Sequence, residues 1–238
     1  RQIAWYDGSI RGFDVELGRL MERLGELGLR EKTLVVFASD HGEEFLEHGR
    51  SFHGQSVYGE LTRVPLLVSW PGTIPANRVI EDTVQTIDIM PTALELSDLP
   101  LPAGMQGESL VPYLLAEEND QVGKRPAISE RAATSPNVGN PPPFGEESFA
   151  IVWEGWKLIH NTKRSGEHPE FELYDQKKDP LDHRNLAEEN PEVVQRLSEQ
   201  LAAWRRQAMA LRLEADAQTT EGMSAEELER LRSLGYIQ

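Results

Sequence analysis

The residues best suited to chemistry are an Asp-His pair and a histidine that follows it closely. The segment FASDHGEEFLEHGRSFHG, residues 37–54, places Asp40 next to His41, and His53 follows a short polar loop. A carboxylate oxygen and an imidazole nitrogen are ordinary ligands of divalent cations. Both side chains can reach one ion if the chain turns sharply, and Gly42 permits such a turn. The Asp-His pair is therefore predicted to bind a metal.

Simpler explanations exist for each of these residues. Asp-His-Gly is a short motif that also fits a cap or a hydrogen-bonded turn, and His53 alone fits a surface loop. The apolar run before Asp40 and the pairing of His53 with a glycine favour the metal site. His48 is interpreted as a structural residue of the polar loop. Arg63 fits a functional cation or a salt bridge to Glu60 equally well.

An α/β arrangement is predicted to position this segment. Apolar residues recur at three- and four-residue spacing over 10–29, which predicts an amphipathic helix. The β-branched run at 33–39 predicts a strand buried on both faces, as in a parallel sheet, and 63–72 predicts a second buried strand. Ligands of open parallel sheets gather beyond the carboxyl ends of the strands, where Asp40 and His41 lie. The expected fold class is α/β, with part of a mostly parallel sheet flanked by helices.

The second half of the chain predicts a smaller α+β subdomain of antiparallel strands plus a helix. The sequence SFAIVWEGWKLIHN, residues 148–161, indicates a hairpin that turns at Glu154-Gly155, and 171–180 adds a third strand. Asn190-Pro191 marks the start of a helix that runs to about Leu211. Trp153 and Trp156 flank the hairpin turn; they fit strand packing better than a sugar platform.

Two further helix starts and a provisional division of the chain follow from local signals. Asp88 to Pro91 suits a helix entry with proline in the first turn, and Ser224 with Glu227 forms a capping box. We expect an α/β catalytic part at 1–115, a Pro/Gly-rich connecting region at 116–147 with one strand near 127–130, and the small subdomain with a helical tail at 148–238.

Composition narrows the classes of function. The 238 residues suffice for one sizeable domain, and the net charge of −16 argues against a nucleic-acid partner. The absence of cysteine removes disulfides, thiolate metal sites and a Cys nucleophile from this stretch. No apolar run approaches the roughly 20 residues of a membrane helix. The chain opens RQIAWYDG, with no initiator Met and no targeting signal, so an upstream portion is expected to be missing.

Three long stretches carry a family pattern. They are YDGSIRGF…FLEHG at 6–49, HGQSVYGELTRVPLLVSWPG at 53–72 with VQTIDIMP…VPYL at 84–114, and WKLIHN…FELYDQKKDPLDHRNLAEENPE at 156–192. Together they resemble the C-terminal half of a sulfatase, within the alkaline phosphatase superfamily. The resemblance leaves out the Pro-rich loop and the extreme tail.

The resemblance implies a metal site and a substrate contact. Family members hold one divalent metal, most commonly Ca²⁺, with Mn²⁺ or Mg²⁺ as alternatives. Asp40 and His41 match the later pair of metal ligands, and two further acids come from an N-terminal strand. His53 matches the position that contacts the sulfate, where many sulfatases carry Lys. The family's formylglycine nucleophile, made from a Cys or Ser, is expected upstream and not in this chain.

The resemblance also implies a reaction. The expected function is hydrolysis of a small-molecule or carbohydrate sulfate ester to alcohol and sulfate, with His53 as a catalytic acid or sulfate-binding residue. The alternatives are a phosphodiesterase or phosphonate monoester hydrolase on the same scaffold, or a binding module that has lost catalysis. The isolated chain is expected to be inactive, and a periplasmic or secreted bacterial protein is implied.

Overall fold

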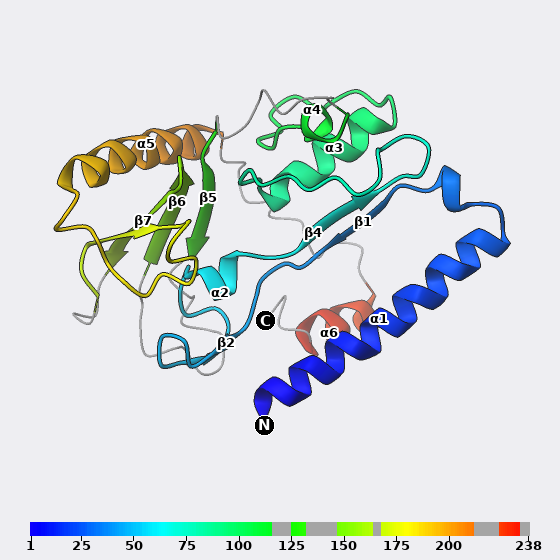
Figure 1. Ribbon diagram of the computed structural model, residues 1–238, viewed down its shortest axis with the longest axis horizontal. Helices are drawn as coiled ribbons and strands as arrows, with labels where there is room; N and C mark the ends of the chain where they lie inside the picture. The colour runs from blue at the N-terminus through cyan, green and yellow to red at the C-terminus, as the bar shows by residue number, and fades with distance from the viewer. Residues whose placement is uncertain (116–124, 132–146, 164–167, 212–223, 234–238) are drawn as a thin grey trace.

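The computed structural model describes residues 1–115, 125–131, 147–163, 168–211 and 224–233. Within these ranges the protein combines helices with a two-stranded sheet, a small hairpin and a four-stranded antiparallel sheet (Figure 1). The predicted α/β class with a smaller antiparallel C-terminal subdomain is confirmed. In the part of the chain that the structure describes, no helix has the length and apolar character that a membrane span requires.

The first region consists of a long helix, a 3-10 turn and two paired strands. Helix α1 covers Gln2–Glu26 and the 3-10 turn covers Arg30–Lys32, before strand β1 at Val35–Ala38. Strand β4 at Leu66–Ser69 pairs with β1 antiparallel, whereas the sequence predicted parallel strands. The chain between them forms a small hairpin and one helical turn, and it supplies no crossover helix of the kind that a parallel connection needs.

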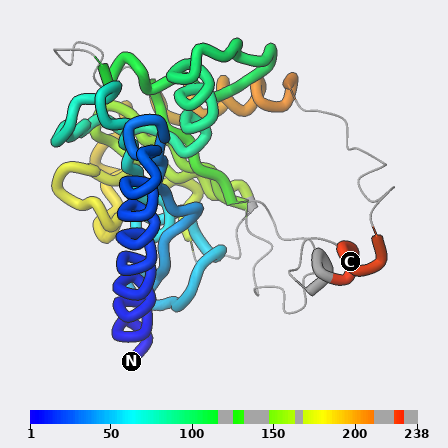
Figure 2. Tube along the Cα trace, turned by 90° about the vertical axis from the view of Figure 1, so that its right-hand side faces the viewer, coloured from blue at the N-terminus to red at the C-terminus, as the bar shows by residue number. Residues whose placement is uncertain are grey.

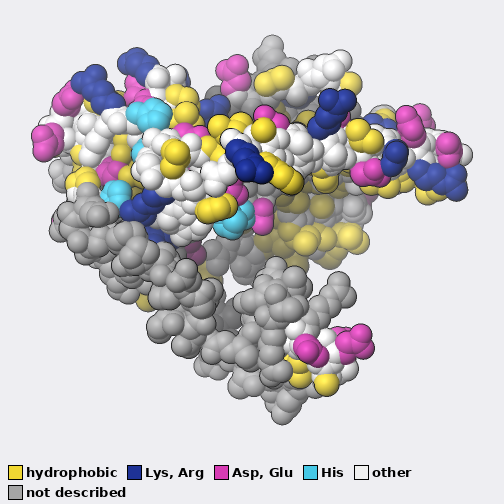
Figure 3. Space-filling view, turned by 90° about the horizontal axis from the view of Figure 1, so that it is seen from below, with side chains coloured by type: hydrophobic (Ala, Val, Ile, Leu, Met, Phe, Trp, Pro, Cys, Tyr) yellow, Lys and Arg dark blue, Asp and Glu magenta, His cyan; other side chains and the backbone are white. Residues whose placement is uncertain are grey.

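The apolar residues of α1 and β1 are less buried than expected. Helix α1 has no buried residue, and Trp5 is 73% exposed. Its contacts to the body include Phe13 against Phe37 of β1, at 5.6 Å between ring centroids. Figure 2 shows α1 running along one side of the molecule, and Figure 3 shows apolar side chains at the surface among charges of both signs. Burial of β1 on both faces is therefore not observed in this structure.

The segment between β1 and β4 carries the predicted functional residues. It contains the short strands β2 at Glu44–Phe45 and β3 at Ser51–Phe52, which pair with each other, and the one-turn helix α2 at Gly59–Thr62. After β4, the predicted helix entry is confirmed. The chain forms a 3-10 turn at Thr86–Asp88, α3 at Ile89–Leu96 and α4 at Val111–Leu115.

The C-terminal subdomain is a four-stranded antiparallel sheet covered by one helix. Its strands are β5 at Ala127–Arg131, β6 at Glu147–Trp153, β7 at Trp156–Lys163 and β8 at Phe171–Asp175, in the order β5-β6-β7-β8. The predicted hairpin turn is confirmed, and Glu154 and Gly155 both have positive φ, at 52° and 80°. This is the geometry of a tight two-residue turn. The domain boundaries at 115 and 148 stay predictions; β5 arises from the predicted connecting region.

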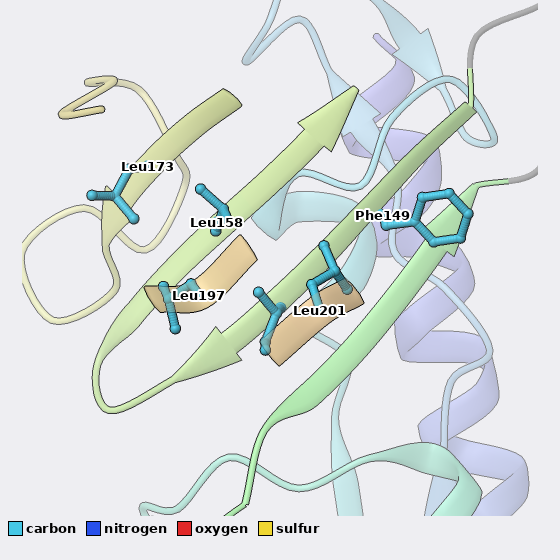
Figure 4. Close-up of a cluster of buried hydrophobic side chains, with 6 residues drawn as sticks. Phe149, Leu158, Leu173, Leu197 and Leu201 are labelled. Carbon is cyan, nitrogen blue, oxygen red and sulfur yellow. The ribbon is translucent and has the colours of Figure 1, made fainter. Parts of the chain in front are cut away.

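The core of this subdomain lies between the sheet and α5, which covers Pro191–Ala210. Leu158 and Leu173 of the sheet are fully buried and pack with Leu197 and Leu201 of the helix (Figure 4). Trp153 and Trp156 pack against this cluster, as predicted for them, and Trp204 of α5 packs there as well. Helix α6 at Ala225–Ser233 starts with the predicted capping box, since Ser224 N donates to Glu227 Oε2 at 2.8 Å. It overlaps α1 in Figure 1 but lies apart from it in Figure 2.

Candidate active site

The three residues predicted to do chemistry lie together beyond the end of β1. The Nε2 atom of His41 lies 3.7 Å from Oδ2 of Asp40. The imidazole rings of His41 and His53 stack at 4.0 Å between centroids, with 29° between their planes. A carboxylate and two imidazoles thus share one surface, although His53 is twelve residues away from His41 in the sequence.

Asp40 presents an ionised, accessible carboxylate. Its Oδ1 atom accepts a hydrogen bond from the backbone N–H of His41 at 3.0 Å, and its side chain is 87% exposed. That hydrogen bond, followed by the charge of the His41 ring, lowers the pKa of Asp40. The contact also fits the simpler turn explanation. It uses only one oxygen, however, and Oδ2 remains directed toward Nε2 of His41.

The ring of His41 has the hydrogen bonding that a metal-ligating histidine needs. Its Nδ1 lies 2.8 Å from the carbonyl oxygen of Gly42. A carbonyl only accepts hydrogen bonds, so Nδ1 carries a proton, and in the neutral ring the lone pair lies on Nε2, on the side of Asp40. This backbone contact is a common way of fixing a ligand's tautomer. The donor set therefore fits part of the shell of a divalent cation.

The residues that the structure describes do not supply the remainder of such a shell. Across the described ranges, no group of three or more His, Cys, Asp or Glu side chains has the geometry to hold a metal ion. Two protein ligands fall short of the six to eight oxygens that Ca²⁺ takes, or the six ligands of Mg²⁺. Asp40 and His41 are thus an incomplete site by themselves.

Gly42 is required for a reason other than the predicted sharp turn. Its φ does not lie in the left-handed region. A Cβ atom at this position would lie 1.9 Å from the carbonyl oxygen of Glu60, so a side chain cannot fit there. The Gly42 N–H donates to the carbonyl of Leu61 at 2.9 Å. The absence of a side chain thus lets the Asp-His segment pack directly against helix α2.

His53 is held on both sides of its backbone and at its ring. Phe52 and Gly54 both have positive φ, at 74° and 86°. The carbonyl of Gly54 accepts a hydrogen bond from Nε of Arg131 on strand β5 at 3.0 Å. The Nδ1 atom of His53 lies 3.2 Å from Oε2 of Glu43, and its side chain is 51% exposed. The ring is therefore oriented, yet one side of it remains open to solvent.

His48, interpreted from the sequence as structural, has three identifiable partners. Its Nδ1 lies 2.8 Å from Oε1 of Glu60, its Nε2 lies 2.9 Å from the carbonyl oxygen of Asp182, and its ring stacks on Tyr58 at 3.8 Å. Glu60 thus pairs with His48. Glu44, buried beneath this loop, accepts hydrogen bonds from the backbone of His48 and of Arg50 at 3.2 and 2.7 Å.

Asp182 connects the predicted site loop to the C-terminal sheet. Its Oδ2 atom accepts from Gly59 N at 2.8 Å and from Nζ of Lys157 at 2.6 Å, while Oδ1 accepts from Gln176 at 2.7 Å. Lys157 and Asp182 are both almost completely buried. Burial raises the pKa of Asp182 and lowers that of Lys157, against the attraction between the two groups. The side chain of Asp182 thereby joins helix α2 to strand β7, and its backbone carbonyl contacts His48.

Sequence reasoning missed Glu43, Asp182 and the partners of His48. The His48–Asp182 contact spans 134 residues and the Gly59–Asp182 contact spans 123 residues. The spacing of neighbouring residues in the sequence does not predict such contacts. For Glu43 the only signal was its place in the predicted site segment, since carboxylates commonly orient histidines at such sites.

We expect His48 to stabilise the fold only while its ring is protonated. Burial lowers the pKa of His48. The hydrogen bonds that its ring donates to Glu60 and to the Asp182 carbonyl, with the charges of Glu60 and Glu44, outweigh burial and raise the pKa to about 9. Because this value lies above the ordinary 6.5, the stabilisation is complete below pH 6.5 and is lost as the pH rises through 9. Its size is about 3 kcal/mol.

Urea unfolding of the wild type and of His48→Gln at about pH 6 and pH 10 measures this contribution. The difference in unfolding free energy between the two proteins should fall by about 3 kcal/mol between these pH values. Other groups that titrate in both proteins cancel in the difference. An equal difference at both pH values contradicts the predicted ion pair.

Comparison with known proteins gives a coherent set of relatives. A family model described as N-sulphoglucosamine sulphohydrolase, C-terminal, matches residues 47–207. Arylsulfatase K of Xenopus laevis is 32% identical over 199 residues, which cover 83% of this chain and 36% of that protein. N-acetylglucosamine-6-O-sulfatase of Bacteroides thetaiotaomicron is 31% identical and is covered to 34%. The chain spans about a third of the length of these curated relatives.

A solved structure extends the comparison to a second chemistry. The phosphonate monoester hydrolase of Agrobacterium radiobacter superposes with a TM-score of 0.67 at 26% sequence identity. The match covers 82% of this chain and 39% of that one. The fold is thus shared between proteins named for sulfate esters and proteins named for phosphonate esters.

Proposed function

This chain belongs to the sulfatase family, and from that premise we propose that it is the C-terminal part of an enzyme that hydrolyses a sulfate ester to an alcohol and sulfate. The observation that carries the proposal is the convergence of Asp40, His41 and His53 beyond the end of β1. The proposal concerns a whole enzyme of which these residues form one part.

Asp40 and His41 would hold one divalent cation, for which we propose Ca²⁺, with Mn²⁺ or Mg²⁺ as alternatives. Support comes from the lowered pKa of Asp40 and from the His41 tautomer that leaves Nε2 free. When bound, such a cation stabilises negative charge on the sulfate oxygens and lowers the pKa of an attacking hydroxyl. The two side chains contribute the ligand atoms and fix their direction.

His53 would bind the sulfate group or protonate the departing alkoxide. Its ring stacks on His41, which places it beside the proposed ligands rather than across the loop from them. Its half-exposed side chain can meet a substrate that approaches from solvent. A group in this position contributes typically 10²–10⁴-fold as a general acid, so about that loss is expected for His53→Ala.

The nucleophile and the other metal ligands would come from outside these 238 residues. The chain has no cysteine, and its described residues supply no third ligand beside Asp40 and His41. We propose a formylglycine nucleophile, as the family resemblance implies. The open apolar surface of α1, which includes Trp5 and Phe13, supports packing against further polypeptide of the same enzyme.

The substrate would be a carbohydrate sulfate ester, acted on in the periplasm or outside a bacterial cell. Support comes from the similarity to N-acetylglucosamine-6-O-sulfatase of a Bacteroides species. A phosphonate monoester or phosphodiester is the second candidate, favoured by the superposition on the Agrobacterium radiobacter hydrolase. A tetrahedral oxyanion is the reacting group in every case, so the described residues serve either chemistry.

Parallel assays of the full-length enzyme on an aryl sulfate, an aryl phosphate diester and a phenylphosphonate monoester test the proposal. We expect the highest kcat/KM on the sulfate and no turnover by the isolated 238 residues. A higher kcat/KM on either phosphorus ester would establish the second candidate. Glu188→Ala, at an exposed position, is the control for His53→Ala. If His53→Ala is as active as the wild type and as this control, the role of His53 is contradicted.

A further inference from the structure

Glu43 is the carboxylate that contacts the ring of His53. Its Oε2 atom lies 3.2 Å from Nδ1 of His53. The side chain of Glu43 is 19% exposed, against 51% for His53. The carboxylate is therefore the more enclosed partner of the two, and the imidazole is the one that reaches into solvent.

The backbone on each side of Glu43 is anchored. Gly42 donates its N–H to Leu61 at 2.9 Å and packs against the backbone of Glu60, where no Cβ would fit. Glu44, on the other side, is 1% exposed and receives hydrogen bonds from the loop that returns through Arg50. Since both neighbours are fixed, the backbone of Glu43 is held in place beside the more exposed ring.

The contact determines which nitrogen of His53 can meet a substrate. A carboxylate only accepts hydrogen bonds, so the Nδ1 of His53 carries the proton in this contact. The Nε2 atom is then the one left to face a substrate, and it donates to a substrate oxygen when it carries a proton as well. The stacking on His41 sets the plane of the same ring. The two contacts together fix the plane of the His53 ring and leave Nε2 for the substrate.

The second oxygen of Glu43 points to a role beyond packing. Its Oε1 atom is buried and has no hydrogen-bond partner among the residues that the structure describes. A buried acceptor without a hydrogen bond lowers the folding stability by about 1–3 kcal/mol. If this position served packing alone, an apolar side chain would make the fold more stable.

We propose that Glu43 is a positioning residue for the reaction, which holds His53 with Nε2 directed at the substrate. This inference rests on the proposed function, because it assumes that His53 contacts the reacting ester. It assigns no direct substrate contact to Glu43. The effect of Glu43 is therefore expected to pass entirely through His53.

Steady-state kinetics of full-length variants on an aryl sulfate test this role. We expect Glu43→Ala to lower kcat about 10–100-fold, the usual effect of removing a partner that orients a functional side chain, with KM changed less than about threefold. Glu43→Gln keeps an oxygen acceptor at the same length and should recover kcat to within about threefold of the wild type. Glu43→Asp keeps the charge but shortens the side chain, so it should remain impaired. If Glu43→Ala does not fold, the Gln and Asp variants decide.

A double-mutant cycle separates positioning from general structural support. In a His53→Ala background, Glu43→Ala should cause no further loss of kcat, because the two residues act as one unit. Additive losses, or Ala and Asp variants with wild-type kcat, overturn the positioning role. A wild-type enzyme that hydrolyses no sulfate ester would overturn the proposed function. A sulfate-active enzyme whose Glu43 variants keep the wild-type kcat would overturn only the positioning role.

Discussion

Replacing Asp182 by asparagine is expected to lower the free energy of unfolding by about 3–5 kcal/mol. The substitution leaves the ammonium group of Lys157 buried, with only 2% of its side chain exposed, beside a neutral amide. A buried charge that loses its direct partner carries a desolvation cost, which the remaining attraction of Glu60 and Glu172 is expected to offset only in part. The hydrogen bond from Gly59 N to Oδ2 is weakened as well.

Asparagine is the informative replacement because the backbone of Asp182 has φ of 61°. Asparagine adopts this left-handed conformation more easily than alanine does, so the backbone contributes little to the measured change. Asp98 has φ of 55° and an exposed side chain. Asp98→Asn is thus a matched control, and it should change the unfolding free energy by less than about 0.5 kcal/mol.

Urea unfolding of these variants measures the effect. The double variant Lys157→Met/Asp182→Asn should recover more than half of the lost stability, because it removes the unpaired charge. A single Asp182→Asn variant within about 1 kcal/mol of the wild type would show that the buried pair does not hold the loop to the sheet.

Replacing His41 by alanine in the full-length enzyme is expected to lower kcat/KM by about 10³-fold. A metal ion supplies several kcal/mol of transition-state stabilisation, and about 1.36 kcal/mol corresponds to a factor of ten in rate. The loss is expected because the substitution removes Nε2, one of the two ligand atoms proposed for this chain. Bound metal, measured by elemental analysis after gel filtration, should fall in parallel. Asp40→Ala should behave in the same way.

His183→Ala is the matched control for His41→Ala. His183 is an exposed histidine that stacks on His48 at 5.3 Å and lies outside the proposed ligand set. Its variant should retain both the bound metal and kcat/KM. Unchanged metal content in His41→Ala, with a control that behaves normally, would contradict the ligand role.

Local signals in the sequence predicted those features that depend on a few neighbouring residues. The turn at Glu154-Gly155 and the start of α5 at Asn190-Pro191 are examples, because positive φ and a proline at the first helical position are local requirements. The proximity of Asp40 and His41 follows from their adjacency. The His53-Gly54 pair a short loop later and the family resemblance both suggested that His53 belongs with them.

Features that depend on contacts between distant segments were not predictable in this way. The antiparallel pairing of β1 with β4 replaced the expected parallel arrangement, because an apolar run does not encode the direction of its partner. The buried carboxylate of Asp182 lies in a segment of polar residues that looks like an exposed turn. Its partners, Lys157 and Gly59, lie far from it in the sequence, so only the structure identifies them.

These contacts give the C-terminal subdomain a part in building the site. Arg131 of β5 holds the carbonyl beside His53, and Asp182 holds helix α2, against which Gly42 packs. The Asp-His segment and the His53 loop are thus both braced from the four-stranded sheet. A loop supported on a rigid element keeps its functional groups in a defined direction.

The most direct test of the metal site is a crystal structure of the full-length enzyme with Mn²⁺, with data collected at the manganese absorption edge. We predict an anomalous peak within about 2.6 Å of a carboxylate oxygen of Asp40 and of Nε2 of His41, the range of metal–ligand distances in proteins. A fully occupied metal peak that contacts neither side chain, in an enzyme that hydrolyses sulfate esters, would contradict the assignment.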